Sequence, residues 1–338
     1  MSIIETIMNI PFEHAKNVFG EFDVYAKKIE KTLHVTLLYR DDELKIIGGK
    51  DAAARAKSVI DNLLELSKRG NIINEQNVNY ALSLSFSDST ESIVEIDNDV
   101  IIRTISQKPI KPKTLGQKHY VDEIRKKMIV FGIGPAGTGK TYLAMAMAIS
   151  AFKNNEVNRI ILTRPAIEAG EKLGFLPGDL QSKIDPYLRP LYDALYQIMG
   201  AENFMANVEK GLIEVAPLAY MRGRTLDNAF IILDEAQNTT QAQMKMFLTR
   251  IGFGSKVIVT GDLSQKDLPS TTVSGLDVAI KVLKDIDDIS IVRLTNEDVV
   301  RHPLVQKIVK AYEVYENREN QREKNKKKSG NYDNKYRK

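Results

Sequence analysis

The segment Gly134 to Thr141 reads GPAGTGKT and has the residue types and spacing of a phosphate-binding P-loop. Its three glycines allow a sharp turn whose backbone N–H groups point toward phosphate oxygens at a helix N-terminus. Lys140 would reach the β- and γ-phosphates, and Thr141 would offer its hydroxyl to Mg²⁺. The expected nucleotide-binding residues of this segment are Gly134, Pro135, Ala136, Gly137, Thr138, Gly139, Lys140 and Thr141.

Two adjacent carboxylates, Asp234 and Glu235, directly follow the apolar run FIIL. Hydrolysis of a nucleotide needs Mg²⁺ held opposite the P-loop and a group that orients the attacking water. Asp234 would hold the metal through its hydration shell, and Glu235 would orient or deprotonate the water. The alternative is a buried strand that merely ends in two exposed acids.

Two glutamines are further candidates. Gln265 ends the string GDLSQ after another apolar run, and it would hydrogen-bond the γ-phosphate or its water and so sense hydrolysis. Gln117 would read the adenine edge of ATP with its amide, by the two-bond geometry that Gln and Asn use on adenine. For each, the alternative is an ordinary surface residue, in a turn for Gln265 and at the start of a helix for Gln117.

Six apolar runs alternate with helix-like runs from Gln117 onward. Unbroken runs such as FIIL and VIV indicate strands buried on both faces, as in a parallel sheet covered by helices. We therefore expect one α/β domain with its binding residues at the carboxyl ends of the strands. The predicted strands are Met128–Ile133, Arg159–Thr163, Leu212–Val215, Phe230–Leu233, Lys256–Thr260 and Ile289–Leu294.

The first hundred residues have a different pattern, typical of a small α+β unit. Residues 100–116 are rich in Pro and Lys, which suits an extended linker that touches the next domain. The predicted N-terminal elements are helices at Val24–Leu33, Asp51–Ser67 and about Asn74–Leu84, and strands at Leu33–Tyr39 and Glu43–Ile47. The predicted division is an α+β unit at 1–99, a linker at 100–116, a P-loop domain at 117–315 and a disordered basic tail at 316–338.

The composition narrows the class of protein. The chain has no Cys, which excludes disulfides and thiolate metal sites, and its four His show no zinc spacing. The N-terminus has acid before any basic cluster and does not resemble a secretory signal. The longest apolar run, Tyr142 to Phe152, is too short to span a membrane. We expect a cytoplasmic protein without a membrane partner.

The net charge of +4 comes from the end of the chain. Residues 316–338 contain nine Lys or Arg and four Asp or Glu, which leaves 39 basic and 40 acidic residues in the rest. Such a tail would tether RNA or a ribosome without sequence preference, by releasing counterions. The alternative is a tail that only keeps the protein in solution.

Longer strings carry a resemblance to a known family. GPAGTGKT, LDEAQ and TGDLSQ resemble motifs I, II and III of superfamily-1 helicase-type motors, whose P-loop NTPase fold is RecA-like. More narrowly, three strings resemble the hallmark stretches of PhoH-like ATPases, a group named for phosphate starvation, over about residues 105–315. These strings are TRPAIEAGEKLGFLPGDLQSKIDPYLRPLYDAL, AYMRGRTLDNAFIILDEAQNTT and DVVRHPLV. The N-terminal unit resembles the KH-like domain of long bacterial PhoH-like proteins, although Gly48-Gly49 does not supply a clean GXXG loop.

The resemblance also marks arginines. It places Arg164 where helicase-type motors contact a nucleic-acid backbone, although a residue at this strand end would also reach the nucleotide. Arg222, Arg224 and Arg301 are candidates for stabilising charge on the γ-phosphate, and Arg222 and Arg224 would equally contact nucleic acid. For each of these three, an ordinary salt bridge is the alternative. The block from Glu168 to Leu195 would be an insertion over the sheet edge, or plain structural packing.

Together these features favour an Mg²⁺-dependent ATPase that acts in RNA metabolism, by remodelling or unwinding RNA. The alternative is an ATP-gated switch that docks an rRNA-processing endoribonuclease, as the resemblance suggests, without unwinding. A small-molecule kinase is disfavoured, because DEAQ and GDLSQ suit water activation and sensing. No second motor domain follows residue 315, so we expect a homo-oligomer, such as a ring, in which a neighbour supplies an arginine.

Overall fold

The computed structural model describes residues 3–86, 98–165, 180–269, 271–300, 304–305, 308 and 311–312, without the side chains of 180–187. Arg301, the predicted tail and residues 168–179 of the predicted insertion lie outside the described part. Within the described part, no helix combines the length and the apolar character that a membrane span requires.

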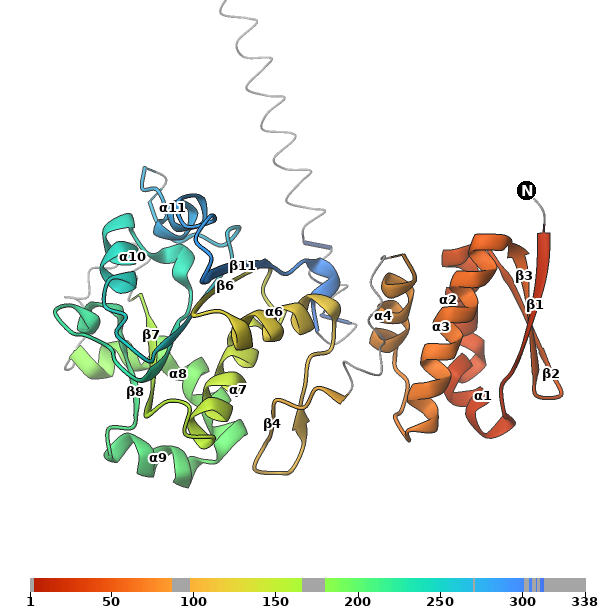
Figure 1. Ribbon diagram of the computed structural model, residues 1–338, viewed down its shortest axis with the longest axis horizontal. Helices are drawn as coiled ribbons and strands as arrows, with labels where there is room; N and C mark the ends of the chain where they lie inside the picture. Colours follow the sequence, from red (N-terminus) through yellow and green to blue (C-terminus); the bar gives the residue numbers. More distant parts are fainter. Residues whose placement is uncertain are drawn as a thin grey trace, which may run out of the picture. The chain divides into compact units, whose positions relative to one another are not determined.

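Residues 3–86 form a three-stranded antiparallel sheet, in the order β1-β3-β2, that packs against helices (Figure 1). Leu44 and Ile46 of the central strand are fully buried in one core with Val59 and Ile60 of the long helix α3. The elements are β1 (Ile3–Asn9), α1 (Phe12–Phe19), the 3₁₀ turn η1 (Glu21–Asp23), α2 (Val24–Leu33), β2 (Thr36–Arg40), β3 (Glu43–Gly49), α3 (Lys50–Lys68) and α4 (Glu75–Phe86).

The strand β1, the helix α1 and the short turn η1 were not among the sequence predictions. A half-buried strand is recognised by alternation of apolar and polar residues. In β1 that alternation is obscured, because the exposed face carries Ile3 and Ile7, which are 75% and 53% exposed. The strand is held instead by its seven-residue pairing with β3, which no local pattern reveals.

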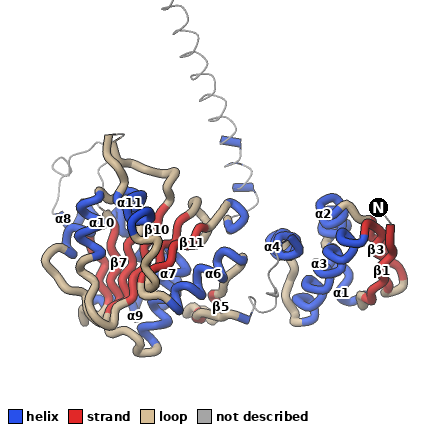
Figure 2. The backbone as a smooth tube through the Cα atoms, turned by 45° about the horizontal axis from the view of Figure 1, so that its top comes forward, coloured by secondary structure: helices blue, strands red, loops and turns tan. Residues whose placement is uncertain are grey.

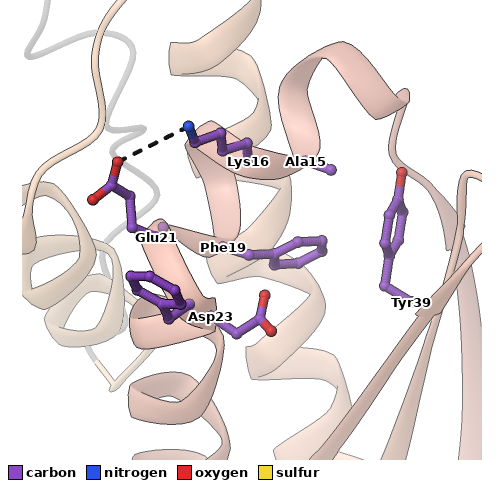
Figure 3. A pocket seen from close by; sticks show the side chains of 8 residues that line it. Ala15, Lys16, Phe19, Glu21, Asp23 and Tyr39 are labelled. Carbon is purple, nitrogen blue, oxygen red and sulfur yellow. Dashed lines mark ion pairs between the residues drawn. The ribbon is translucent and has the colours of Figure 1, made fainter.

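A tight turn joins α1 to α2 and borders a pocket of about 460 Å³ (Figure 3). Gly20 has φ 76°, and Phe22 and Asp23 also have positive φ, near 57° and 59°. The ring of Phe22 is 89% exposed, and the carboxylates of Glu21 and Asp23 face solvent beside it. The pocket is lined by Ala15, Lys16, Phe19, Gly20, Glu21, Phe22, Asp23 and Tyr39.

Residues 98–299 contain a six-stranded, wholly parallel sheet in the order β11-β6-β10-β9-β7-β8, with helices on both faces (Figure 2). The predicted fold class, a parallel sheet covered by helices, is confirmed, and all six predicted strands are present. The strands are β6 (Ile129–Ile133), β7 (Arg159–Arg164), β8 (Ile213–Pro217), β9 (Ala229–Leu233), β10 (Lys256–Gly261) and β11 (Ile289–Arg293). The helices are α6 (Leu115–Lys126), α7 (Lys140–Lys153), α8 (Leu180–Met199), α9 (Ala201–Glu209), α10 (Gln241–Leu248) and α11 (Gly275–Val282), with short 3₁₀ turns η3 (Leu218–Met221), η4 (Ala236–Asn238) and η5 (Asn296–Asp298).

The sheet separates two apolar cores, and successive residues of a strand enter opposite ones. Ile160 and Leu162 of β7 belong to the core under α6, α7, α8 and α9, whereas Ile161 belongs to the core under α10 and α11. All five residues of β9 are buried. This burial on both faces explains the unbroken apolar runs in the sequence.

The predicted linker contains regular structure. Strands β4 (Ile102–Arg103) and β5 (Pro109–Ile110) form a short hairpin, and helix α6 begins at Leu115. Ile101 and Ile110 are buried in the same core as α7 and α8, and Ser150 of α7 donates a hydrogen bond to the carbonyl of Ile101 at 3.1 Å. The chain before α6 is therefore packed against the parallel-sheet fold.

The strand before the P-loop lies against an aromatic ring. Tyr120 of α6 is fully buried, and a Cβ atom placed on Gly132 of β6 would lie 2.6 Å from its ring. The hydroxyl of Tyr120 has no hydrogen-bond partner among the described residues. Burial, and to a smaller extent the charge of Asp234, raise the pKa of Tyr120. A side chain at position 132 would therefore collide with a neutral, tightly packed ring.

Gly132→Ala is expected to lower the free energy of unfolding by about 1–3 kcal/mol, because the added methyl group must displace the Tyr120 ring within a packed core. Urea unfolding followed by circular dichroism measures the loss. The matched variant Tyr120→Phe keeps the ring and removes an unpartnered hydroxyl, so stability should stay the same or rise. Equal destabilisation of both variants would contradict this account.

Candidate functional site

The loop from Gly134 to Gly139 joins the end of β6 to the start of α7. Its first N–H, from Gly134, donates to the carbonyl of Gly261 at the end of β10, at 3.1 Å. Gly137 and Gly139 have φ 86° and 79°, in the left-handed region that L side chains rarely adopt. Helix α7 begins directly afterwards, at Lys140. The loop therefore has the position and backbone geometry of a phosphate cradle at a helix N-terminus.

Lys140 is folded back over this loop. Its Nζ donates to the carbonyls of Gly134 and Pro135 at 2.7 and 2.8 Å, and it lies 3.3 Å from the hydroxyl of Thr138. The residue is only 9% exposed. Carbonyl oxygens thus hold the ammonium group at the loop. A bound phosphate would replace them as its hydrogen-bond acceptor.

Asp234, at the end of β9, is the most connected carboxylate of the site and is 4% exposed. Its Oδ1 accepts hydrogen bonds from the hydroxyls of Thr141 at 2.7 Å and Thr260 at 2.6 Å. Its Oδ2 accepts from Nη2 of Arg164 at 2.9 Å. Four different elements of the fold therefore meet at this one side chain. Sequence reasoning gave no role to Thr260, although its place at the end of the predicted strand Lys256–Thr260 was a usable signal.

The residues present fit a magnesium ion. Thr141 and Asp234 put a hydroxyl and a carboxylate side by side at the start of α7, which is the protein donor set expected there. No cluster of three or more His, Cys, Asp or Glu that could hold a metal occurs among the residues described. Mg²⁺ suits such a sparse site, because it takes most of its ligands from phosphates and water.

Glu235 is held on both carboxylate oxygens. Oε1 accepts from Nη2 of Arg164 at 3.1 Å, and Oε2 accepts from Nε2 of Gln237 at 2.5 Å. The backbone of Glu235 is left-handed, with φ 53° and ψ 38°, a strained conformation for a residue with a side chain. Gln237, 1% exposed, also accepts at Oε1 from the backbone N–H of Asp262 at 3.0 Å. Gln237 thus links Glu235 to the chain after β10. Gln237 stood within the string LDEAQ but was assigned no role there.

Further bonds join the turn η4 to the segment that follows β10. The side-chain amide of Asn238 donates to Oδ2 of Asp267, and the backbone N–H of Asp267 donates to Oδ1 of Asn238, both at 2.9 Å. Ser274 donates to the carbonyl of Gln237 at 2.7 Å, and the N–H of Gly275 donates to the carbonyl of Thr239 at 2.7 Å. Hydrogen bonds therefore connect Glu235, through Gln237 and η4, to described residues between Asp262 and Gly275.

The two predicted glutamines lie in different settings. Gln265 is exposed in a turn after β10, where its N–H donates to the carbonyl of Asp262 at 3.2 Å. Gln117 is 3% exposed, and its amide bridges the N–H of Lys113 at 2.7 Å and the carbonyl of Thr138 at 3.0 Å. Gln117 therefore braces the P-loop, with both ends of its amide bonded to backbone groups, and the surface position considered for it does not occur.

The candidate arginines also lie in different surroundings. Arg164 contacts Asp234 and Glu235, so the structure brings it to the carboxylates. Arg224 pairs through both Nη atoms with Glu214 of β8 at 2.6 Å, and this hydrogen bonding raises the pKa of its guanidinium. Arg222 is exposed. Arg301 lies outside the described residues.

A parallel sheet with a P-loop after one strand and an acidic pair at the end of the strand two positions away defines a P-loop NTPase. A family model described as PhoH-like protein matches residues 109–313. The PhoH-like protein of Bacillus subtilis is 52% identical over 301 residues, covering 89% of this chain and 94% of the relative. That of Mycobacterium tuberculosis is 52% identical over 314 residues, covering 93% and 89%. The chain belongs to the PhoH-like protein family.

Likeness to solved structures is more distant. The Pif1 helicase from Candida albicans has 15% sequence identity and a TM-score of 0.29, over 54% of this chain and 40% of that chain. A match this weak supports no inference about activity. Membership of the family and the P-loop geometry together imply that the protein binds a nucleotide.

Lys140→Ala is expected to abolish nucleotide binding, because it removes the only P-loop side chain that carries a positive charge. Titration with a fluorescent ADP analogue measures the affinity. Lys256→Ala is the matched control. Lys256 also donates to backbone carbonyls, those of Ile124 and Arg125, and burial lowers its pKa, but it lies at the opposite end of β10. Unchanged affinity of the Lys140→Ala protein would refute the assignment.

Proposed function

We propose that this protein is an Mg²⁺-dependent ATPase. The observation that carries the proposal is the 2.7 Å hydrogen bond between Thr141 of the P-loop helix and Asp234. Glu235 follows Asp234 directly, after the end of β9. Phosphoryl transfer to water needs a phosphate cradle, a metal-holding carboxylate and a group that orients water, and these are the residue types present. The absence of Cys from the sequence suits a reducing compartment, and we place the protein in the cytoplasm.

Each residue would have one task in this reaction. Lys140 and the loop N–H groups bind the β- and γ-phosphates, while Thr141 and Asp234 hold Mg²⁺. The bound metal supplies neutralisation of charge on the phosphate oxygens. Glu235 takes a proton from the attacking water or orients it, and Gln237 fixes the carboxylate that does so. We assign Gln117 to the adenine side of the loop, and Gln265 and Arg301 to sensing and stabilising the γ-phosphate.

Glu235→Gln is expected to keep ATP binding and to slow hydrolysis by about 10²–10⁴-fold, because the amide cannot accept the proton from water. Phosphate release under saturating ATP measures the rate, and binding of a fluorescent nucleotide confirms an intact site. Glu209→Gln, at an exposed position on α9, is the control and should behave as wild type. A Glu235→Gln protein with an unchanged rate would remove this residue from the mechanism.

We further propose RNA as the macromolecular substrate, to be remodelled or unwound, with a homo-oligomer such as a ring completing the site by an arginine from a neighbour. The basic C-terminal sequence and the helicase-like motifs support this. The bonds from η4 to the described residues between Asp262 and Gly275 supply a route from Glu235 to an exposed surface. The turn at Gly20 to Asp23 is a poor place for RNA phosphates, because Glu21 and Asp23 would repel them. The same route would serve an ATP-gated switch that docks an endoribonuclease.

Single-stranded RNA is expected to stimulate the ATPase rate several-fold, and less so as salt rises, because phosphate contacts release counterions. Rates with and without RNA, over a range of salt concentrations, measure this, and a strand-displacement assay follows with the same RNA. No stimulation and no displacement would exclude the motor and favour the switch.

A further inference from the structure

Arg164 occupies the two carboxylates that the proposed reaction needs. A single nitrogen atom, Nη2, lies 2.9 Å from Asp234 and 3.1 Å from Glu235. The side chains of Arg164 and Asp234 are 16% and 6% exposed, so solvent screens this contact only weakly. The arginine therefore bridges the two acids, and its single positive charge offsets one of their two negative charges.

A metal ion held by Asp234 would have to share this aspartate with Arg164. Oδ1 of Asp234 is already shared by Thr141 and Thr260, and Oδ2 faces the guanidinium. A divalent cation held by Asp234 would repel a guanidinium in contact with that carboxylate, because like charges at such a distance in a partly buried site interact strongly. Arg164 and Mg²⁺ thus compete for one side chain.

Release of this contact has a second effect. Because the same Nη2 serves both acids, Arg164 cannot move away from Asp234 without also weakening its bond to Oε1 of Glu235. Gln237 would still hold Oε2, since its own amide is fixed by the N–H of Asp262. Glu235 would then remain in place with one oxygen open to water.

We propose that Arg164 is a positioning residue that holds Asp234 and Glu235 in a closed arrangement, and that it leaves both when Mg²⁺-nucleotide binds. The proposal rests on the proposed function, since it needs a metal at Asp234. Arg164 is the last residue of β7, and its strand neighbour β9 delivers Asp234 to it, so the exchange needs only side-chain rotation. The catalytic glutamate thereby becomes available only once the metal and the nucleotide are in place.

The test is the effect of Mg²⁺ on nucleotide affinity. A fluorescent ADP analogue is titrated with and without Mg²⁺, the latter in EDTA, and the ratio of the two dissociation constants gives the advantage due to the metal. In Arg164→Gln this advantage is expected to rise about tenfold over wild type, because the metal no longer displaces a cation and the metal-free nucleotide meets two unpaired acids. In Arg164→Lys, which keeps a positive charge, the rise should be smaller.

Two controls separate a structural role from the proposed one. Arg125→Gln breaks another arginine pair, with Asp99 on a different surface, and should leave the ratio unchanged. Arg164→Met preserves the apolar stem, should the Gln variant fail to fold as judged by circular dichroism. If Arg164 only supports the fold or only touches phosphate, both affinities fall together.

An unchanged or reduced ratio in the Arg164 variants overturns the inference. Its failure is distinct from failure of the proposed function. A wild-type protein that binds the analogue no better with Mg²⁺ than without it would refute the metal site itself. A wild-type advantage that Arg164→Gln and Arg164→Met leave untouched refutes only the competition.

Discussion

A single buried carboxylate ties this fold to its chemistry. Asp234 receives hydroxyl groups from Thr141 of α7 and Thr260 of β10 and a guanidinium from Arg164 of β7, while its own strand, β9, is buried throughout. A carboxylate buried in such a place is stabilised by the hydrogen-bond donors on both of its oxygens. The hydrogen bonds of Asp234 therefore depend on the register of three parallel strands and on where the P-loop helix begins.

The sequence predicts the sheet well because its strands are buried on both faces. Runs such as FIIL have the length of a strand and are too short for a typical helix. Each is followed by a polar string of the kind expected at a strand end. The positions of Asp234, Glu235 and Lys140 relative to the elements follow from this.

What the sequence could not supply depends on which strands become neighbours. Arg164 and Asp234 are seventy positions apart, and only the pairing of β7 with β9 brings them together. The link from Gln237 to Asp262 likewise requires that β9 and β10 be adjacent. In the N-terminal unit, β1 is specified by its partner β3 and not by its own alternation. These contacts join residues that are distant in the sequence, so a local sequence pattern does not reveal them.

The hairpin of β4 and β5 bears on how this P-loop fold can be divided or transplanted. Ile101 and Ile110 fill part of the core beneath α7 and α8, so the fold begins well before the P-loop and before the predicted boundary at Gln117. A gene fusion or truncation made at that boundary would strip two side chains from the core and leave an apolar face uncovered. Any shuffling of this module in evolution, or in the laboratory, has to carry the hairpin with it.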